Sequence, residues 1–304
     1  MNVLVTLSQM QNRKISKRYK LDQSPFYCLC SRRKLAEILH TTPNQLKAIL
    51  SNKKLYIGRN KDISKKSSDK PKFRYIEEPI TSLKRIQKRV AFILSCIELP
   101  DFVYSPAKGK SCISNAKLHQ SNSVLMSLDI KKFFPSTSSQ KVCRFFSERM
   151  RCSPDVSAIL VSLLTYKGRL PTGSPSSPIM SYYAHINMWE SINQIVKKVD
   201  CAFSLWVDDI TISGNEIPEQ TKIQVKKAIK NNGLSYHKEK HYKKNSIKEV
   251  TGIIIAKGKL KSPNRHHLAR KNLKQKILNQ TDPDIKCSLI RSLKGLEVQM
   301  SKVV

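Results

Sequence analysis

FSLWVDDITIS, residues 203–213, is the stretch that decides the fold. Two β-prone apolar runs flank the acidic pair Asp208 and Asp209, which is the pattern of a hairpin with carboxylates at its tip. Aspartates are common in turns, so this pair on its own favours an ordinary structural turn.

A second short apolar run, VLMSLDI at residues 124–130, predicts a buried strand with Asp129 at its end. Two carboxylates about 4 Å apart repel by roughly 4 kcal/mol at an effective dielectric of 20, and three need strong compensation. Two divalent cations supply it, and oxygen ligands with no histidine nearby in the sequence favour Mg²⁺ over zinc. Taken together, the two stretches predict that Asp129, Asp208 and Asp209 hold two Mg²⁺ ions.

The segment between the acidic stretches contains LPTGSPSSP, residues 170–178, followed by an amphipathic run over residues 179–196. Its prolines and Gly173 interrupt any regular element, and Ser176 or Ser177 can cap the helix that follows. Such loops usually connect elements. Because this one lies between two acidic motifs, we expect it to face a substrate.

Composition indicates a globular protein with a polyanionic partner. The chain has 304 residues, 39% of them hydrophobic, which allows one large or two modest domains. Its formal net charge of +34 makes nucleic acid the leading partner. The basic excess lies in residues 1–121 and 216–304, while 122–215 are nearly neutral. This distribution is expected of an enzyme that binds a polyanion on two sides of its active site. It is equally expected if residues 122–215 are simply the buried core, and charge alone does not distinguish the two interpretations.

The sequence gives no sign of a membrane or of secretion. No stretch approaches about 18 consecutive apolar residues, and the opening run over residues 1–7 lacks a basic start and a cleavage pattern. We therefore expect a cytoplasmic protein. The eight cysteines include no C-x-x-C pair, only Cys28-Leu29-Cys30, which predicts reduced, mostly buried thiols rather than a zinc site or disulfides.

Helical periodicity appears in three places. Residues 31–50 predict two short helices, which either pack against the core or form a DNA-reading helix-turn-helix, with packing favoured. Residues 57–72 are polar and basic and predict a loop or hairpin tip that reaches phosphates, and a helix begins near Ile80. Residues 259–304 predict a basic helical segment.

Over residues 73–260 these motifs resemble those of reverse transcriptases. Asp129-Ile130-Lys131-Lys132-Phe133-Phe134 resembles the first metal-binding motif of the polymerase palm, residues 170–178 the second, and Trp206-Val207-Asp208-Asp209 the third. Arg74-x-Ile76-x-x-Pro79 followed by Leu83-Lys84 resembles the fingers pattern. Trp206 stands where Tyr is usual, and Thr172 where many relatives have Gln.

Two further strings narrow the resemblance to bacterial retron reverse transcriptases. Asn115-Ala116-Lys117-Leu118-His119 is similar to their Asn-Ala-x-x-His signature, and Val250-Thr251-Gly252 to their Val-Thr-Gly signature. The resemblance implies an α+β right-hand polymerase, with N-terminal helices and fingers over 1–121, a palm with an antiparallel sheet over 122–258, and a helical thumb over 259–304.

The function implied by the resemblance is RNA-directed DNA synthesis from deoxynucleoside triphosphates with Mg²⁺. A cognate structured non-coding RNA would be template and primer source, the product would be branched RNA–DNA (multicopy single-stranded DNA), and an effector protein in anti-phage defence is a further implied partner. An inactive RNA-binding scaffold of the same fold and a group II intron-type enzyme are the alternatives.

The resemblance also implies roles for individual residues. The metal ligands are Asp129, Asp208, Asp209 and the Ile130 carbonyl, and Lys240, in Gly233-Leu234-x₅-Lys240, is the general acid. The nucleotide-binding residues are Arg74, Lys108, Lys110, Thr172, Gly173 and Phe134, the last as a steric gate against a 2′-hydroxyl. The primer or template contacts are Trp206, Asn115, His119, Lys259, Lys261, Arg265 and Arg270.

Overall fold

The computed structural model describes residues 18–62 and 73–303. The chain divides into two compact units, one formed by Met1–Leu99 and Thr137–Ala184 and the other by Pro100–Ser136 and His185–Val304. The chain therefore passes between the units three times. The predicted boundaries at residues 121 and 258 do not coincide with these units, because each unit is assembled from segments far apart in the sequence.

The first unit is mainly helical, with one antiparallel β-hairpin in which β1 pairs with β2. Two helices of the predicted 31–50 region begin at Ser31 and Thr42, whose side chains accept hydrogen bonds from the amides of Lys34 and Gln45. The elements are η2 (Leu21–Gln23), α1 (Arg32–Ile38), α2 (Pro43–Ser51), β1 (Tyr56–Asp62), β2 (Phe73–Pro79), α3 (Thr81–Ser95), α6 (Ser139–Arg144), η3 (Phe145–Arg149), α7 (Pro154–Leu164) and α8 (Ser177–Ala184).

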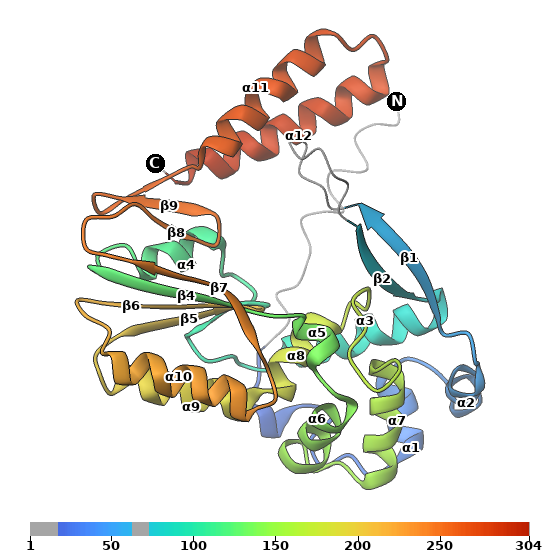
Figure 1. Cartoon of the computed structure of the whole chain (residues 1–304). Coiled ribbons are helices and arrows are strands. Elements are labelled where there is room, and N and C mark those ends of the chain that lie inside the picture. Colours follow the sequence, from blue (N-terminus) through green and yellow to red (C-terminus); the bar gives the residue numbers. More distant parts are fainter. Residues whose placement is uncertain (1–17, 63–72, 304) are drawn as a thin grey trace. The chain divides into compact units, whose positions relative to one another are not determined.

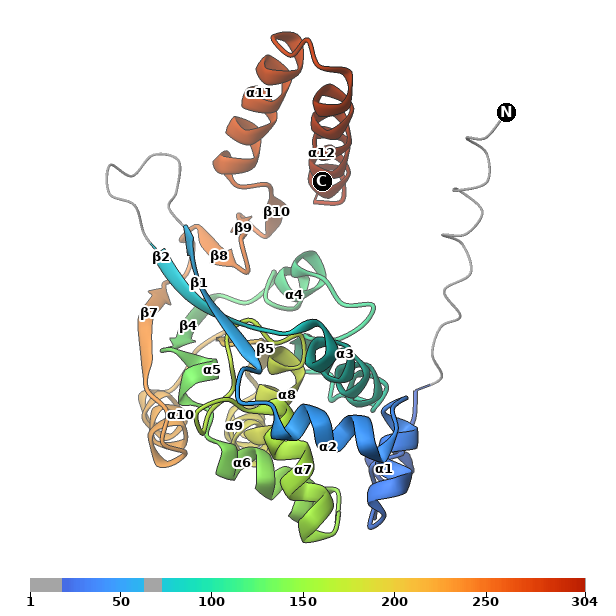
Figure 2. The same ribbon diagram turned by 90° about the vertical axis from the view of Figure 1, so that its right-hand side faces the viewer.

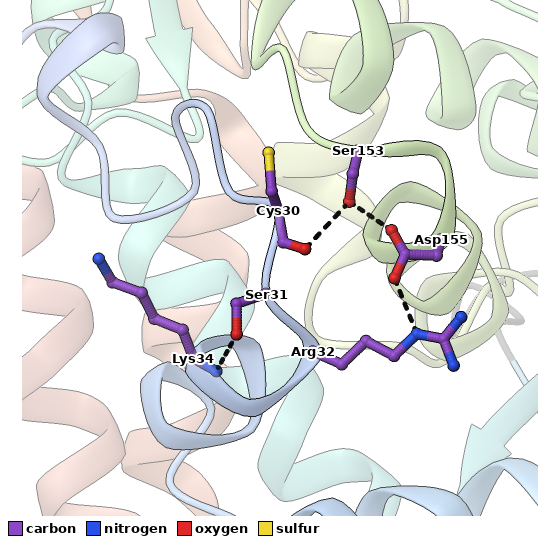
Figure 3. A network of polar contacts seen from close by, with 6 residues as sticks. All are labelled: Cys30, Ser31, Arg32, Lys34, Ser153 and Asp155. Atoms are coloured by element: carbon purple, nitrogen blue, oxygen red, sulfur yellow. Dashed lines mark hydrogen bonds and ion pairs between the residues drawn. The ribbon is translucent and has the colours of Figure 1, made fainter.

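Helices α1 and α2 both pack against α7, which supports the packing interpretation of residues 31–50. Figure 3 shows how the chain before α1 is tied to the start of α7. The Ser153 hydroxyl donates to the Cys30 carbonyl at 3.5 Å and also to Asp155, whose other carboxylate oxygen accepts from Arg32 Nε at 2.8 Å. The helix predicted from Ile80 is α3, and its apolar face is buried.

The second unit contains a five-stranded sheet of order β3-β5-β6-β4-β7, antiparallel except for β3 with β5. A three-stranded sheet of order β10-β9-β8 follows. The elements are β3 (Val103–Ser105), α4 (Cys112–Leu118), β4 (Val124–Ile130), α5 (Phe133–Ser136), α9 (Ile186–Lys197), β5 (Ala202–Trp206), β6 (Asp209–Gly214), α10 (Glu219–Asn231), β7 (Tyr236–Tyr242), β8 (Lys248–Val250), β9 (Ile253–Ala256), β10 (Lys259–Lys261), α11 (Asn264–Leu278) and α12 (Pro283–Ser301).

Helices α9 and α10 lie side by side on one side of the five-stranded sheet (Figure 1). Helix α4 packs against β8 and β9, and a core of apolar side chains joins α4, β4 and the small sheet, with Ile113, Leu125 and Ile253 among its members. Helices α11 and α12 run beside one another as a helical hairpin (Figure 2). The sheet thus supports the carboxylate-bearing strand ends, and the small sheet leads into the basic helices.

Three sequence-based expectations need correction. Residues 57–62 are part of strand β1 rather than of a loop, while residues 63–72 lie outside the described residues. The amphipathic run over 179–196 is two helices, α8 and α9, separated at His185. Residues 259–261 form strand β10, because they pair with β9, so the helical segment begins only at Asn264.

All eight cysteines are free thiols, but the expectation that most of them are buried is wrong, because only Cys96, Cys152 and Cys201 are buried. No helix in the described part of the chain is both long and apolar enough to cross a membrane.

Candidate active site

Strands β4 and β6 bring the predicted carboxylates together. In their antiparallel ladder Asp129 lies directly opposite Asp209. The amide nitrogen of Ile130 donates a hydrogen bond to the Asp208 carbonyl at 2.9 Å, so the backbone of Asp208 is fixed against the end of β4. Asp129 and the consecutive pair Asp208-Asp209, which are far apart in the sequence, therefore meet at the same end of neighbouring strands.

The hairpin predicted from residues 203–213 is present, with Val207 and Asp208 connecting β5 to β6. Val207 has φ +57°, a left-handed conformation that a β-branched residue rarely adopts. Its amide donates to the Ser105 carbonyl at 3.0 Å, which helps to hold the turn. Trp206 ends β5 opposite Asp209, so its partly buried ring lies beside the carboxylates.

The pKa of Asp209 lies well above its ordinary value. Burial, reinforced by the nearby Asp208 and Asp129, raises the pKa of Asp209 to about 6. Lys238 and Lys240 act in the opposite direction and only partly offset this rise. The set is therefore short of positive charge, which is the property expected of a site that binds cations.

A β-bulge in β7 places an extra lysine at this edge. The β4–β7 register shifts between Ser127, opposite Lys240, and Asp129, opposite His237, and Lys238 has φ +54°. Lys238 Nζ lies 2.5 Å from Asp129 Oδ2, and that hydrogen bond raises the pKa of Lys238. His237 Nδ1 is 3.4 Å from Asp129 Oδ1. The bulge thus puts a lysine and a histidine beside the carboxylates.

Two of the three carboxylate residues line a cavity of about 310 Å³ in the second unit. Asp129 and Asp209 line it together with Lys240, which the sequence predicts as a general acid. On its other side the wall is formed by the turn between β8 and β9 and by the start of α11. The lining residues are Ser127, Leu128, Asp129, Trp206, Asp209, Thr211, Lys238, Lys240, Glu249, Thr251, Gly252 and Arg265.

The donor set fits a hard divalent cation. Its atoms are carboxylate oxygens and, at Ile130, a backbone carbonyl, which suit Mg²⁺ rather than a soft metal. Across residues 18–62 and 73–303, no three His, Cys, Asp or Glu side chains are already arranged around a metal position. The Asp129 carboxylate instead accepts a hydrogen bond from Lys238. The Asp129 side chain must therefore turn away from Lys238 before it can bind a metal ion.

Comparison with known proteins identifies the family. The family model described as "Reverse transcriptase (RNA-dependent DNA polymerase)" matches residues 63–255, which is more than half of the chain. This chain belongs to the reverse transcriptase family. The predicted resemblance is therefore confirmed, and the three acidic residues lie within the matched region.

The curated relatives are retron reverse transcriptases. The chain is 34% identical over 210 residues to the retron Se72 reverse transcriptase of Salmonella heidelberg, a match that covers 65% of this chain and 55% of that protein. It is 26% identical over 203 residues to the retron Ec86 reverse transcriptase of Escherichia coli, covering 65% of this chain and 63% of that protein. The chain thus spans between half and two thirds of the length of these reverse transcriptases.

The second reverse transcriptase motif is anchored to β2 in the first unit. The Thr172 hydroxyl accepts from the Glu77 amide and donates to the Tyr75 carbonyl, both at 3.2 Å, and the Gly173 amide donates to the Glu77 carbonyl at 3.1 Å. The Thr172 hydroxyl is therefore engaged with backbone rather than free for a nucleotide sugar. Arg74 lies on the same strand, opposite Lys61.

Lys108 and Lys110 do not belong with the fingers segment that the sequence predicts over residues 1–121. Both follow β3 in the second unit. Lys110 Nζ donates to the Asp101 carbonyl and lies 4.6 Å from the centre of the Tyr104 ring. They lie in the second unit because its first segment begins at Pro100, before the predicted boundary at residue 121.

Phe134 and Phe133 begin the short helix α5 and differ in burial. Phe133 is buried, and its ring lies 5.4 Å from that of His185 and 6.0 Å from that of Trp189, measured between centroids. Phe134 is only partly buried. Phe134 is thus the member of the pair whose ring is more available to a ligand, and its role as a steric gate stays a prediction.

Asn115 and His119 are not surface contacts for RNA, because both side chains are fully buried. His119 bonds to two strands at once, with Nδ1 2.6 Å from Ser213 Oγ and Nε2 2.8 Å from Ser204 Oγ. Burial lowers the pKa of His119 to about 3. Asn115 Nδ2 donates to Thr251 Oγ1 at 3.4 Å, which joins the two retron-like signatures. Their predicted role as primer or template contacts is therefore wrong in this conformation.

The basic residues near the C-terminal end fall into two groups. Lys259, Lys261 and Arg270 are exposed. Arg265 instead contacts Glu249 and the Gly252 carbonyl. Sequence reasoning missed Lys238 and His237, since neither a bulge nor a positive φ at Lys238 has a signal in this sequence. Thr251 and Gly252, which the sequence singled out only as part of a retron-like signature, line the cavity.

Proposed function

We propose that this chain is a retron-type RNA-directed DNA polymerase. The observation that supports this best is the position of Asp129 directly opposite Asp209, with the Asp208 backbone bonded to Ile130. In this proposal the five-stranded sheet is the palm, the first unit supplies the fingers, and α11 with α12 forms the thumb. A cytoplasmic location is part of the proposal.

Asp129 and Asp208 are the principal Mg²⁺ ligands in the proposed mechanism, with Asp209 in support and the Ile130 carbonyl as a further donor. Mg²⁺ bound to these residues would supply positive charge that lowers the pKa of the primer hydroxyl and offsets the charge that develops on the reacting phosphate. Lys240 donates a proton to the departing pyrophosphate. It lines the same cavity as Asp129, which supports this role.

The substrate contacts in this proposal are those that the family resemblance implies. Phe134 excludes ribonucleotides, and Trp206 offers a flat surface to the primer end. Arg74, Lys108, Lys110 and the Thr172-Gly173 backbone contact the nucleotide. Lys259, Lys261 and Arg270 contact RNA phosphates by charge and shape rather than by base sequence.

The partner we propose is a structured non-coding RNA that serves as template and primer source. The product is branched RNA–DNA, and an effector protein with a role in anti-phage defence completes the system. The similarity to proteins named retron reverse transcriptases supports this narrower proposal.

Primer extension on an RNA template with Mg²⁺ tests the proposed activity. The double variant D208N/D209N is expected to lose DNA synthesis while its affinity for RNA stays within about twofold, because no phosphate contact is removed. D200N is the matched control, since Asp200 is exposed and precedes β5. Synthesis by D208N/D209N would defeat the catalytic assignment, and RNA binding without synthesis by the unmodified protein would favour an inactive scaffold.

A further inference from the structure

We propose that Arg265 is a positioning residue that holds the β8–β9 turn against the catalytic cavity, and that it is not a contact to RNA phosphate. The inference rests on the proposed polymerase function, because that function assigns the cavity its chemistry. It departs from the sequence-based expectation, which groups Arg265 with the RNA-binding cations of α11.

The Arg265 guanidinium has two acceptors on the turn. Nη1 donates to Glu249 Oε1 at 2.9 Å, at the end of β8, and Nη2 donates to the Gly252 carbonyl at 3.1 Å. The planar fork of an arginine is suited to two acceptors held in fixed positions. One side chain from the first turn of α11 thus spans the β8–β9 turn.

The turn is built to admit this side chain. Gly252 has φ +83°, and a Cβ atom there would lie 2.4 Å from Arg265 Nη2, so the close approach depends on glycine. Thr251 has φ +45°, also in the left-handed region. Glycine adopts such a φ without strain, but a β-branched residue such as Thr251 needs contacts that keep it there.

Helix α4 holds the opposite side of the same turn. The Thr251 hydroxyl donates to the Cys112 carbonyl at 3.2 Å and accepts from Asn115 Nδ2 at 3.4 Å. Thr251 and Gly252 line the cavity that also contains Asp129 and Asp209. The turn is therefore fixed from α4 and from α11, and loss of either support would move one wall of the cavity.

Charge pairing separates Arg265 from its neighbours. Lys259, Lys261 and Arg270 have no acidic partner among the residues that the structure describes, so they are available to phosphates. Arg265 pairs with Glu249, and 57% of its side chain is exposed. An ion pair this exposed adds little to stability, so its removal affects the position of the turn more than folding.

The salt dependence of RNA binding distinguishes the two roles. Each phosphate contact contributes about 0.7 to 0.9 to the slope of log affinity against log salt. R270M is expected to reduce the slope by about that amount, whereas R265M, which loses the same charge from the same helix, leaves it unchanged. A slope reduced equally in R265M and R270M would overturn the proposal.

Two further measurements test the positioning role itself. R265M is expected to lower kcat for primer extension about tenfold with KM for the nucleotide within about twofold, since small displacements at an active site cost this much. E249A keeps every positive charge but removes the acceptor of Arg265 Nη1, and it is expected to show the same loss. An E249A variant with unchanged kcat would contradict the inference.

Hydrogen exchange separates this inference from the proposed function. The amides of residues 249–253 are expected to exchange faster in R265M and E249A than in the unmodified protein. If the unmodified protein lacks polymerase activity, the proposed function fails. Faster exchange in R265M, together with an unchanged salt slope, would still show that Arg265 holds the β8–β9 turn. Unchanged exchange in both variants would overturn the positioning role of Arg265.

Discussion

Asp129 and Asp209 face each other as a cross-strand pair, and the pKa of Asp209 rises to about 6 as a result of burial and of the neighbouring carboxylates. Like charges opposed on a sheet destabilise it unless a cation lies between them. The opposed carboxylates destabilise the sheet, so their presence indicates a functional role rather than a structural one.

Acidification is expected to relieve this destabilisation. The folded-state pKa of Asp209 lies above its ordinary value of 3.8, so the group contributes stability at low pH that is lost as the pH rises through about 6. In EDTA, the free energy of unfolding of the protein minus that of D209N should increase as the pH falls from about 7 to about 4. Urea titrations of both proteins measure this difference, and parallel pH profiles would contradict it.

His119 is expected to have the opposite effect. Its folded-state pKa of about 3 lies below the ordinary value of 6.5, so its contribution to stability is present above pH 6.5 and is lost as the pH falls toward 3. Relative to H119Q, the protein should lose about 1.4 kcal/mol per pH unit in this range. An unfolding free-energy difference that does not change between pH 6.5 and about pH 4 would show that His119 is not a buried neutral group.

Phe134 and Phe133 provide a matched pair for sugar selectivity. F134A is expected to admit ribonucleotides, because removal of the ring leaves room for a 2′-hydroxyl. F133A is expected to lose about 3 to 5 kcal/mol of stability through a cavity beside Trp189, without a change in the ratio of deoxyribonucleotide to ribonucleotide incorporation. Competitive incorporation assays measure the ratio. An unchanged ratio in F134A would show that Phe134 is not the steric gate.

Glycine substitutions test how the second motif is attached. A Cβ at Gly173 would lie 2.5 Å from the Glu77 carbonyl oxygen, so G173A must displace the loop from β2 and should cost about 1 to 3 kcal/mol. A Cβ at Gly295, within α12, would meet no atom within 4 Å, so G295A should stabilise by up to about 1 kcal/mol. Thermal unfolding compares the two, and equal melting temperatures would show that Gly173 is not closely packed.

The convergence of Asp129 with Asp208 and Asp209 could be predicted from sequence, because strand periodicity and the paired aspartates each have a local signal. The burial of Asn115 and His119 could not, since a helix face reveals spacing but not what covers it. Lys238 was missed because a bulge is set by pairing with β4. The same limit applies to Arg265, whose basic neighbours resemble it in sequence although its contacts differ.

Cleavage of the protein backbone by hydroxyl radicals from bound Fe²⁺ tests the central claim most directly, since cuts occur only near the ion. We expect Fe²⁺ to cut both at the end of β4, near residue 129, and in the β5–β6 turn, near residue 208, with Mg²⁺ competing at both positions. Cuts at only one of these places, or cuts that Mg²⁺ does not suppress, would show that the two strand ends do not share a cation.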